Sequence, residues 1–270
     1  MKIDSGGVTL DVQVEGTGRP VVLVHGWPDT KRLWSKQVPA LAAAGFQVIT
    51  YDQRGYGASD KPAEVEAYSL PFLALDATNI LDHLGIERAH LVGHDWGAAV
   101  AWAVASLAPA RVDHLVALSV GNPSSFSRPS YGQREKSWYM LLFQLTPEGE
   151  NWVTEAHLRD WAHHPDAAAV YAELLNDGSV TPGLNYYRAN VPPGAMFGPP
   201  VELPPVQAPT MGVWSSADFA LLEEQMTGSA EFCTGGWRYQ RVEGAGHWFQ
   251  WEQPERVNEL LLDFLPRSAA

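Results

Sequence analysis

The stretch Gly93-His94-Asp95-Trp96-Gly97 places one acidic side chain between small residues. The apolar residues 89–92 before it predict a buried strand, and the alanine-rich residues 99–105 after it predict a helix. A strand, a sharp turn and a helix form a nucleophile elbow, in which the turn is strained and the helix packs close to the strand. The elbow would present Asp95 above the sheet, and a side chain at Gly93 or Gly97 would clash.

Asp95 takes the position at which esterases carry a serine, and this changes the chemistry. A serine needs a base to remove its proton, whereas an aspartate is ordinarily ionised at neutral pH. Carboxylates form covalent intermediates in several classes of enzyme. We therefore interpret Asp95 as a nucleophile that attacks a saturated carbon bearing a leaving group. The alternative is that this stretch is a polar turn with no catalytic role, and the strand–turn–helix context argues against it.

A covalent enzyme ester is released by water if a base accepts a proton. His247 is the candidate base, because it lies on the glycine-rich loop after the last predicted strand and an imidazole titrates near neutrality. Asp218 follows the preceding strand and is the candidate acid that orients the imidazole, which gives the chain order nucleophile, acid, histidine. The alternatives are a structural histidine and a helix N-cap for the segment from Phe219.

The histidines near these motifs are assigned no chemistry. His94 precedes the nucleophile, points the other way at the turn and is predicted to be structural. His163 and His164 lie in a segment rich in aromatic residues and are predicted to face solvent.

The carbonyl oxygen of an ester gains negative charge when water attacks it, so main-chain N–H groups should face it. Trp96 follows the nucleophile and is predicted to supply one N–H group. Trp27 follows His25-Gly26 after an apolar strand and is predicted to supply the other, in a loop shaped by Pro28. Both tryptophans can also pack, because the donors belong to the main chain.

Apolar runs alternate with helical stretches from residue 21 to 120 and again from 210 to 264, after an early antiparallel strand at 8–15. This alternation predicts a mostly parallel sheet with helices on both faces. Residues 124–205 hold many Trp and Tyr residues and no strong strand, and they predict a helical cap. We expect core segments at 1–123 and 206–270 around a cap at 124–205. The helices predicted in the core are 30–44, 68–84, 99–105, 220–226 and 254–264.

The chain has 270 residues and a formal net charge of −13, from 18 basic and 31 acidic side chains. Such a surface is a poor partner for nucleic acid or an anionic membrane. No apolar run reaches the length of a membrane span, and the first residues lack the apolar core of a signal peptide. Cys233 is the single cysteine, which fits a reducing compartment. We expect a cytoplasmic protein, and a homodimer remains open.

Taken together, these motifs resemble the α/β-hydrolase superfamily, in its branch of epoxide hydrolases and haloalkane dehalogenases. His25-Gly26-Trp27-Pro28 resembles the HGxP motif, and the stretch around Asp95 resembles the GHDWG elbow of soluble-type epoxide hydrolases. Gly246-His247-Trp248 resembles the histidine loop, and Asp218-Phe219 the acid loop. The resemblance covers nearly the whole chain and implies an α/β-hydrolase fold with the cap inserted.

Two tyrosines of the cap distinguish the two activities. Epoxide hydrolases of this type hold the epoxide oxygen with cap tyrosines, and a neutral phenol can donate a hydrogen bond at pH 7. Leu184-Asn185-Tyr186-Tyr187-Arg188 is similar to the LNxYR motif, which marks Tyr187. The residues around Tyr139 are similar, more loosely, to the earlier helix of the cap. Aromatic packing is the alternative for either tyrosine.

The resemblance thus implies hydrolysis of a small apolar or aromatic epoxide to a vicinal diol, through an ester of Asp95. Tyr139, Tyr187, Trp27, Trp96 and Trp248 are expected to contact the substrate. The sequence shows no zinc-ligand spacing and no phosphate-binding loop, so we expect no metal and no cofactor.

Two other functions remain open. A haloalkane dehalogenase would use the same triad, with Trp96 and a cap tryptophan such as Trp138, Trp152 or Trp161 donating to the halide. The apolar residues after Asp95 argue against an acid substrate. A hormone-receptor-like relative that binds its ligand with little turnover would keep a serine at the elbow, so Asp95 argues against it.

Overall fold

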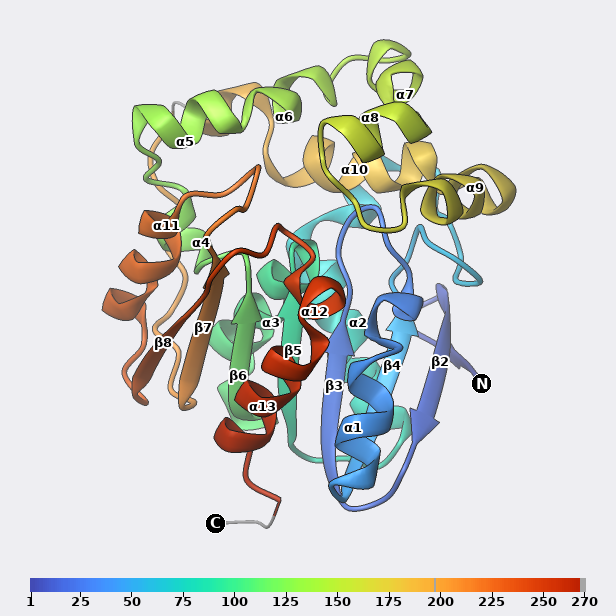
Figure 1. Ribbon diagram of the computed structural model, residues 1–270. Coiled ribbons are helices and arrows are strands. Elements are labelled where there is room, and N and C mark those ends of the chain that lie inside the picture. The colour runs from blue at the N-terminus through green and yellow to red at the C-terminus, as the bar shows by residue number, and fades with distance from the viewer. Residues whose placement is uncertain (197, 268–270) are drawn as a thin grey trace.

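A sheet of eight strands runs through residues 1–196 and 198–267, the part of the chain that the computed structural model describes (Figure 1). The strand order is β1-β2-β4-β3-β5-β6-β7-β8. The pairs β1–β2 and β2–β4 are antiparallel, and every other pair is parallel. This confirms the predicted mostly parallel sheet with an early antiparallel strand. The bounds are β1 Lys2–Asp4, β2 Thr9–Glu15, β3 Arg19–Val24, β4 Phe46–Asp52, β5 Ala89–His94, β6 Val112–Leu118, β7 Thr210–Ser215 and β8 Trp237–Val242.

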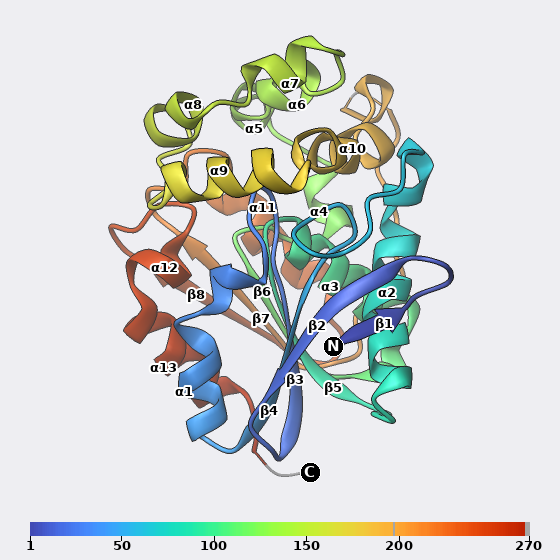
Figure 2. The ribbon, with the colours of Figure 1, turned by 90° about the vertical axis from the view of Figure 1, so that its right-hand side faces the viewer.

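Helices cover both faces of the sheet, which explains why its central strands are rich in apolar residues (Figure 2). Successive side chains of a strand point to opposite faces, so Val21 and Leu23 belong to one core cluster while Val22 and Val24 belong to the other. On the face of Val22, α2 Leu70–His83 and α3 Trp96–Leu107 contribute to the core cluster, together with residues of the chain between β6 and β7. The other face is covered by α1 Gln37–Ala43, α12 Phe249–Glu252 and α13 Pro254–Phe264.

The chain between β6 and β7 forms a cap that lies over the carboxyl ends of the parallel strands, above the sheet in Figure 1. In open α/β sheets this is the edge at which ligands bind. No helix within the described residues is both long and apolar enough to cross a membrane. The cap helices are α4 Pro123–Phe126, α5 Tyr131–Lys136, α6 Trp138–Leu142, α7 Glu148–Trp152, α8 Glu155–Asp160, α9 Ala167–Asp177 and α10 Val180–Asn190.

Several core elements differ from the sequence prediction. The helix expected over 30–44 is split into a 3₁₀ turn, η1 Lys31–Trp34, and α1, because Pro39 lacks an N–H group and is tolerated only in the first turn of a helix. The helix expected over 220–226 begins only at α11 Glu223–Thr227, because the preceding N–H groups bind the Asp218 carboxylate. Strand β1 was not predicted and has three residues, too few for a periodic signal.

Candidate active site

The turn between β5 and α3 has the geometry expected of a nucleophile elbow. Asp95 has φ 55° and ψ −123°, a conformation that costs energy for any residue other than glycine. A methyl group at Gly93 would overlap the carbonyl group of Gly97, and one at Gly97 would overlap the carbonyl group of Val24 in β3. The expected clash at both glycines is therefore confirmed, and the close approach of α3 to the sheet depends on them.

The carboxylate of Asp95 lies between two different groups. The main-chain N–H of Trp27 donates to its Oδ1 atom at 2.8 Å. Its Oδ2 atom lies 3.6 Å from Nε2 of His247. Trp96 is the first residue of α3, so its N–H has no acceptor within the helix. One carboxylate oxygen is thus held by the main chain, and the other faces an imidazole.

The loop that carries Trp27 is fixed by a buried histidine. The N–H of Gln53 donates to Nε2 of His25 at 2.9 Å, so the proton of this imidazole lies on Nδ1, which donates to the Gly26 carbonyl at 3.0 Å. Burial lowers the pKa of His25, which keeps the ring neutral and preserves this tautomer. A methyl group at Gly26 would overlap the Asp95 carboxylate, so glycine is required there.

Asp218 holds His247 from the side opposite Asp95. Its Oδ2 atom accepts a hydrogen bond from Nδ1 of His247 at 2.8 Å, and the Oγ of Ser119 donates to the same oxygen at 2.7 Å. Its Oδ1 atom accepts from the N–H groups of Ala220 and Leu221 at 2.9 and 3.0 Å. Asp218 therefore caps this turn and orients the imidazole at once, so the two alternatives for this residue are compatible.

The electrostatics of the pair follow from burial and mutual attraction. Burial alone would raise the pKa of Asp218, but the attraction of His247 and the hydrogen bonds from His247 and Ser119 outweigh it, and the pKa is lowered. Burial alone would lower the pKa of His247, but Asp218 and Asp95 together raise it to about 10. The imidazole is therefore protonated at neutral pH while Asp218 is charged.

The two cap tyrosines line the same cavities as Asp95. Tyr139 is in α6 and Tyr187 in α10, and their ring centroids are 5.9 Å apart. Both line a cavity that Asp95 also lines, and both side chains are buried. Burial is the main cause that raises both pKa values well above the ordinary value of a phenol, and the nearby charge of Asp95 adds to it. Both hydroxyl groups therefore remain protonated and can donate.

Two cavities meet at Asp95. A small one of about 10 Å³ is lined by Asp95, His247, Trp27 and Trp248, among others. A larger one of about 350 Å³ extends along α3 under the cap and is lined mainly by apolar side chains. Tyr139 and Tyr187 line both cavities, Trp96 lines the larger one, and Trp27 and Trp248 line the smaller one, so the described lining includes all five predicted substrate contacts. It does not include the three cap tryptophans considered as halide donors, Trp138, Trp152 and Trp161.

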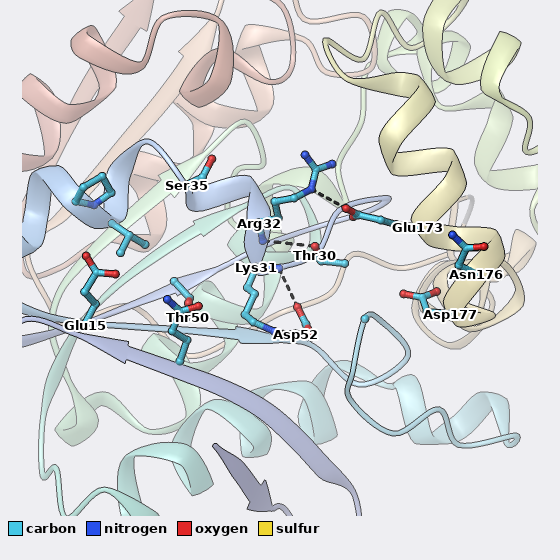
Figure 3. Close-up of a pocket in the computed structure, with 14 residues that line it drawn as sticks. Glu15, Thr30, Lys31, Arg32, Ser35, Thr50, Asp52, Glu173, Asn176 and Asp177 are labelled. Atoms are coloured by element: carbon cyan, nitrogen blue, oxygen red, sulfur yellow. Dashed lines mark hydrogen bonds and ion pairs between the residues drawn. The ribbon is translucent and has the colours of Figure 1, made fainter.

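A larger polar cleft of about 720 Å³ lies elsewhere, between β2, β4, η1 and α9 (Figure 3). Both of its basic side chains pair with acidic side chains of the cleft. Lys31 pairs with Asp52 at 2.6 Å, and Arg32 pairs with Glu173 at 2.8 Å. None of the predicted site residues lines it. We therefore assign the chemistry to the cavities at Asp95.

The structure contradicts the prediction for His164. It is buried and not solvent-facing: its Nδ1 accepts the N–H of Asp166 at 3.0 Å, and its Nε2 lies 3.4 Å from Oδ1 of Asp29. The other oxygen of Asp29 accepts the indole N–H of Trp248 at 2.8 Å. Burial alone would raise the pKa of Asp29, but His164 and Trp248 lower it. This buried carboxylate joins the cap to the loop of His247.

Other contacts of the site were also not predicted from the sequence. Ser119 follows β6 with a φ of 72°, and its Oγ lies 3.0 Å from Nδ1 of His247. The signal available was its place at the end of a strand that neighbours β5 in the sheet. His94 is buried, and its Nε2 lies 2.9 Å from the carbonyl of His247. Burial, followed by the proximity of His247, lowers the pKa of His94 to about 4, so the ring is neutral and structural, as predicted.

Comparison with known proteins gives one consistent result. The family model of the alpha/beta hydrolase fold matches residues 19–141. Epoxide hydrolase A of Mycobacterium tuberculosis (strain ATCC 25618 / H37Rv) is 33% identical over 97% of this chain and 96% of its own length. The crystal structure of epoxide hydrolase A from Mycobacterium thermoresistibile has a TM-score of 0.80 at 30% identity, over 98% of this chain and 97% of that chain. A Bacillus megaterium epoxide hydrolase, solved with an inhibitor, has a TM-score of 0.85 at 26% identity, over 98% and 99%.

Proposed function

The chain belongs to the epoxide hydrolases of the alpha/beta hydrolase fold, and we propose that it hydrolyses an apolar epoxide to a vicinal diol through a covalent ester of Asp95. The observation that carries this proposal is the position of the Asp95 carboxylate. One oxygen accepts the N–H of Trp27 and the other faces His247, in a cavity that the buried Tyr139 and Tyr187 also line. A carboxylate that faces both an electrophile and a base is what a two-step displacement needs.

Ring opening is the first step of the proposal. Tyr139 and Tyr187 hydrogen-bond the epoxide oxygen, and Oδ2 of Asp95 attacks one ring carbon from the side opposite the breaking C–O bond. The carbon–Oδ2 bond forms as the ring C–O bond breaks, and a tyrosine proton passes to the departing oxygen. The product is a hydroxyalkyl ester of Asp95. General acid assistance of this kind contributes about 10²–10⁴-fold to a rate.

Hydrolysis of the ester is the second step. His247, oriented by Asp218, takes a proton from a water molecule that attacks the ester carbonyl carbon. The N–H of Trp27, already directed at Oδ1, stabilises the negative charge that develops on that oxygen, together with the N–H of Trp96. The bond between this carbon and Oδ2 then breaks, the proton that His247 took from water passes to Oδ2, and the diol leaves with Oδ2 as one of its hydroxyl oxygens. The carboxyl group regenerated on Asp95 gives its proton to His247, which restores the resting pair.

The protonated state of His247 supports the order of these steps. Two carboxylates hold its proton in the resting enzyme, so it cannot act as a base there. Ester formation removes the charge of Asp95 and leaves Asp218 as the one remaining carboxylate partner. The pKa of His247 therefore falls after the substrate is attached, and the proton that it releases restores the tyrosine that protonated the epoxide oxygen. His247 is then neutral when a base is first needed.

A single-turnover reaction in heavy-oxygen water tests the proposal. Excess protein is mixed with styrene oxide, and the diol and the peptide that contains Asp95 are analysed by mass spectrometry. We expect unlabelled diol and one heavy oxygen in that peptide, because water attacks the ester and not the ring. Labelled diol with an unlabelled peptide would mean direct attack by water, and would overturn the role of Asp95. The Asp95→Asn variant, which lacks the ionised nucleophile, is the matched control.

A further inference from the structure

The space around Asp95 is unequal on its two sides, and we propose that the enzyme selects terminal epoxides that carry one elongated apolar chain. The chain lies in the cavity along α3, and the small cavity beside His247 receives only water. This inference rests on the proposed function and names the substrate class of the same site.

The large cavity follows one face of α3. Its lining includes Trp96, Ala99, Ala103 and Leu107, which are spaced by three or four residues and so lie in one row along the helix. The small side chains of Ala99 and Ala103 leave space in the cavity close to Asp95. From Trp96 to Leu107 the helix rises by roughly 16 Å. Leu107 and Val201 are 52% and 47% exposed, so the cavity reaches the surface between two apolar side chains.

Polar side chains that border this cavity are engaged with the protein itself. Asn190 accepts the N–H of Leu70 and donates to the carbonyl groups of Tyr68 and Tyr186. The hydroxyl of Ser137 accepts from Gln133, that of Ser127 accepts the N–H of Val201, and the Nε of Arg134 donates to the Pro129 carbonyl. With these groups so engaged, the walls favour an alkyl or aryl chain. The volume of about 350 Å³ is typical of a small-molecule pocket.

The small cavity has a different character. Its volume of about 10 Å³ is close to the space that one water molecule requires. The rings of Phe219 and Trp248 stack on each other at 5.9 Å along its wall. Trp248 is held by its hydrogen bond to the buried Asp29, so this wall cannot easily retreat. His247 and Asp95 supply the polar partners that a water molecule needs.

These two observations together define the substrate. An epoxide bound with its ring between Asp95 and the tyrosines has one direction open to a substituent, along α3. A chain on the second ring carbon would have to enter the space beside His247, where it would displace the water that the second step consumes. Terminal epoxides fit, and internal epoxides with a chain on each carbon do not.

The test is a comparison of kcat/KM across two sets of epoxides with the wild-type enzyme. The terminal set is epoxybutane, epoxyhexane, epoxyoctane and epoxydecane. Each added methylene that enters the channel should raise kcat/KM by about four-fold, the gain expected for burying one methylene. The trans epoxide in the middle of the decane chain should be at least about 100-fold slower than terminal epoxydecane, because each of its chains is four methylenes shorter than the chain of the terminal epoxide and four methylenes correspond to roughly 200-fold.

The outcomes separate the two proposals. Equal kcat/KM for the internal and terminal decane epoxides, or no dependence on chain length, would overturn the selection for one chain while epoxide hydrolysis stands. If none of the epoxides in either set is hydrolysed, the proposed function is overturned as well.

Variants locate the chain within the structure. Ala99→Leu fills the channel close to Asp95 and should lower the ratio of kcat/KM for epoxydecane over epoxybutane by about ten-fold or more. Leu107→Asp places a charge at the exposed mouth and should lower kcat/KM for epoxydecane while the steps between shorter chains persist. Ala168→Leu, at an exposed site of α9, is the matched control and should leave the ratio unchanged. If Ala99→Leu does not fold, the exposed Leu107→Asp carries the test; an unaltered ratio in the folded variants would overturn the assignment.

Discussion

Replacing Asp95 by asparagine should lower the pKa of His247 from about 10 to roughly 7. Asparagine keeps the shape of the carboxylate and removes its charge, as formation of the ester would. The imidazole then retains Asp218 as its one charged partner, at 2.8 Å. The prediction therefore tests in a stable variant the electrostatic change that the proposed second step requires.

The magnitude follows from the distance between the two groups. Nε2 of His247 lies 3.6 Å from Oδ2 of Asp95. Two unit charges at this separation attract by about 4–5 kcal/mol at an effective dielectric constant of about 20. One pH unit of pKa corresponds to about 1.4 kcal/mol, so the loss of Asp95 lowers the pKa by about three pH units. A base with a pKa near 7 is well matched to catalysis at neutral pH.

Proton NMR titration of the histidine rings measures the effect. The His247→Gln variant assigns the resonance by its disappearance. His90 is the internal control and should titrate identically in both proteins. Burial lowers its pKa to about 4, and its ring is hydrogen-bonded to the carbonyl of Pro266. Intact mass before and after titration checks that the amide at position 95 has not been hydrolysed. A pKa for His247 that moves by less than about one pH unit would mean that Asp218 alone holds the proton, and would refute the reasoning.

Three further predictions address the remaining groups. His247→Gln should trap the ester, because ring opening continues while hydrolysis stops; intact-protein mass spectrometry should then show one equivalent of epoxide added at Asp95, and an unmodified protein after prolonged incubation would contradict this. Tyr139→Phe and Tyr187→Phe should each slow ring opening by about 100-fold or more in stopped-flow tryptophan fluorescence, because each removes a donor to the epoxide oxygen; a change of less than about three-fold would remove that tyrosine from the mechanism. Asp29→Ala should lower the free energy of unfolding by about 3–5 kcal/mol in urea titrations, because two buried donors lose their acceptor; a loss below about 1 kcal/mol would show that water replaces the carboxylate.

The elbow and the order of its partners could be predicted from the sequence because each leaves a local signal. Gly93 and Gly97 are required because a side chain at either position would overlap a nearby carbonyl group, and strand β5 carries apolar residues on both sides of His90. His247 and Asp218 each follow a strand of a parallel sheet, and the carboxyl ends of such strands share one edge. Chain order and strand ends were therefore sufficient to bring the three residues together.

The contacts that escaped prediction join segments far apart in the chain. Asp29 and His164 are separated by 135 positions, and no periodic pattern links a loop after β3 to a turn of the cap. Ser119 owes its place to a left-handed backbone conformation that sequence does not normally give a serine. The channel along α3 was equally hidden, because alanines in a helix are typical of any close packing.

The contacts of Asp29 and Arg32 bear on how the molecule opens. Both residues follow the loop of Trp27 within a few positions, and both hold the cap, Asp29 through His164 and Arg32 through Asp166 at 2.7 Å. Separation of the cap would therefore break contacts of the segment that follows the Trp27 N–H donor. Regions that open together share one free energy of opening in native-state hydrogen exchange. The amides of 164–177 and 25–34 should thus exchange as one cooperative unit. Residues of the cap and of the core would then unfold together, with one free energy of opening.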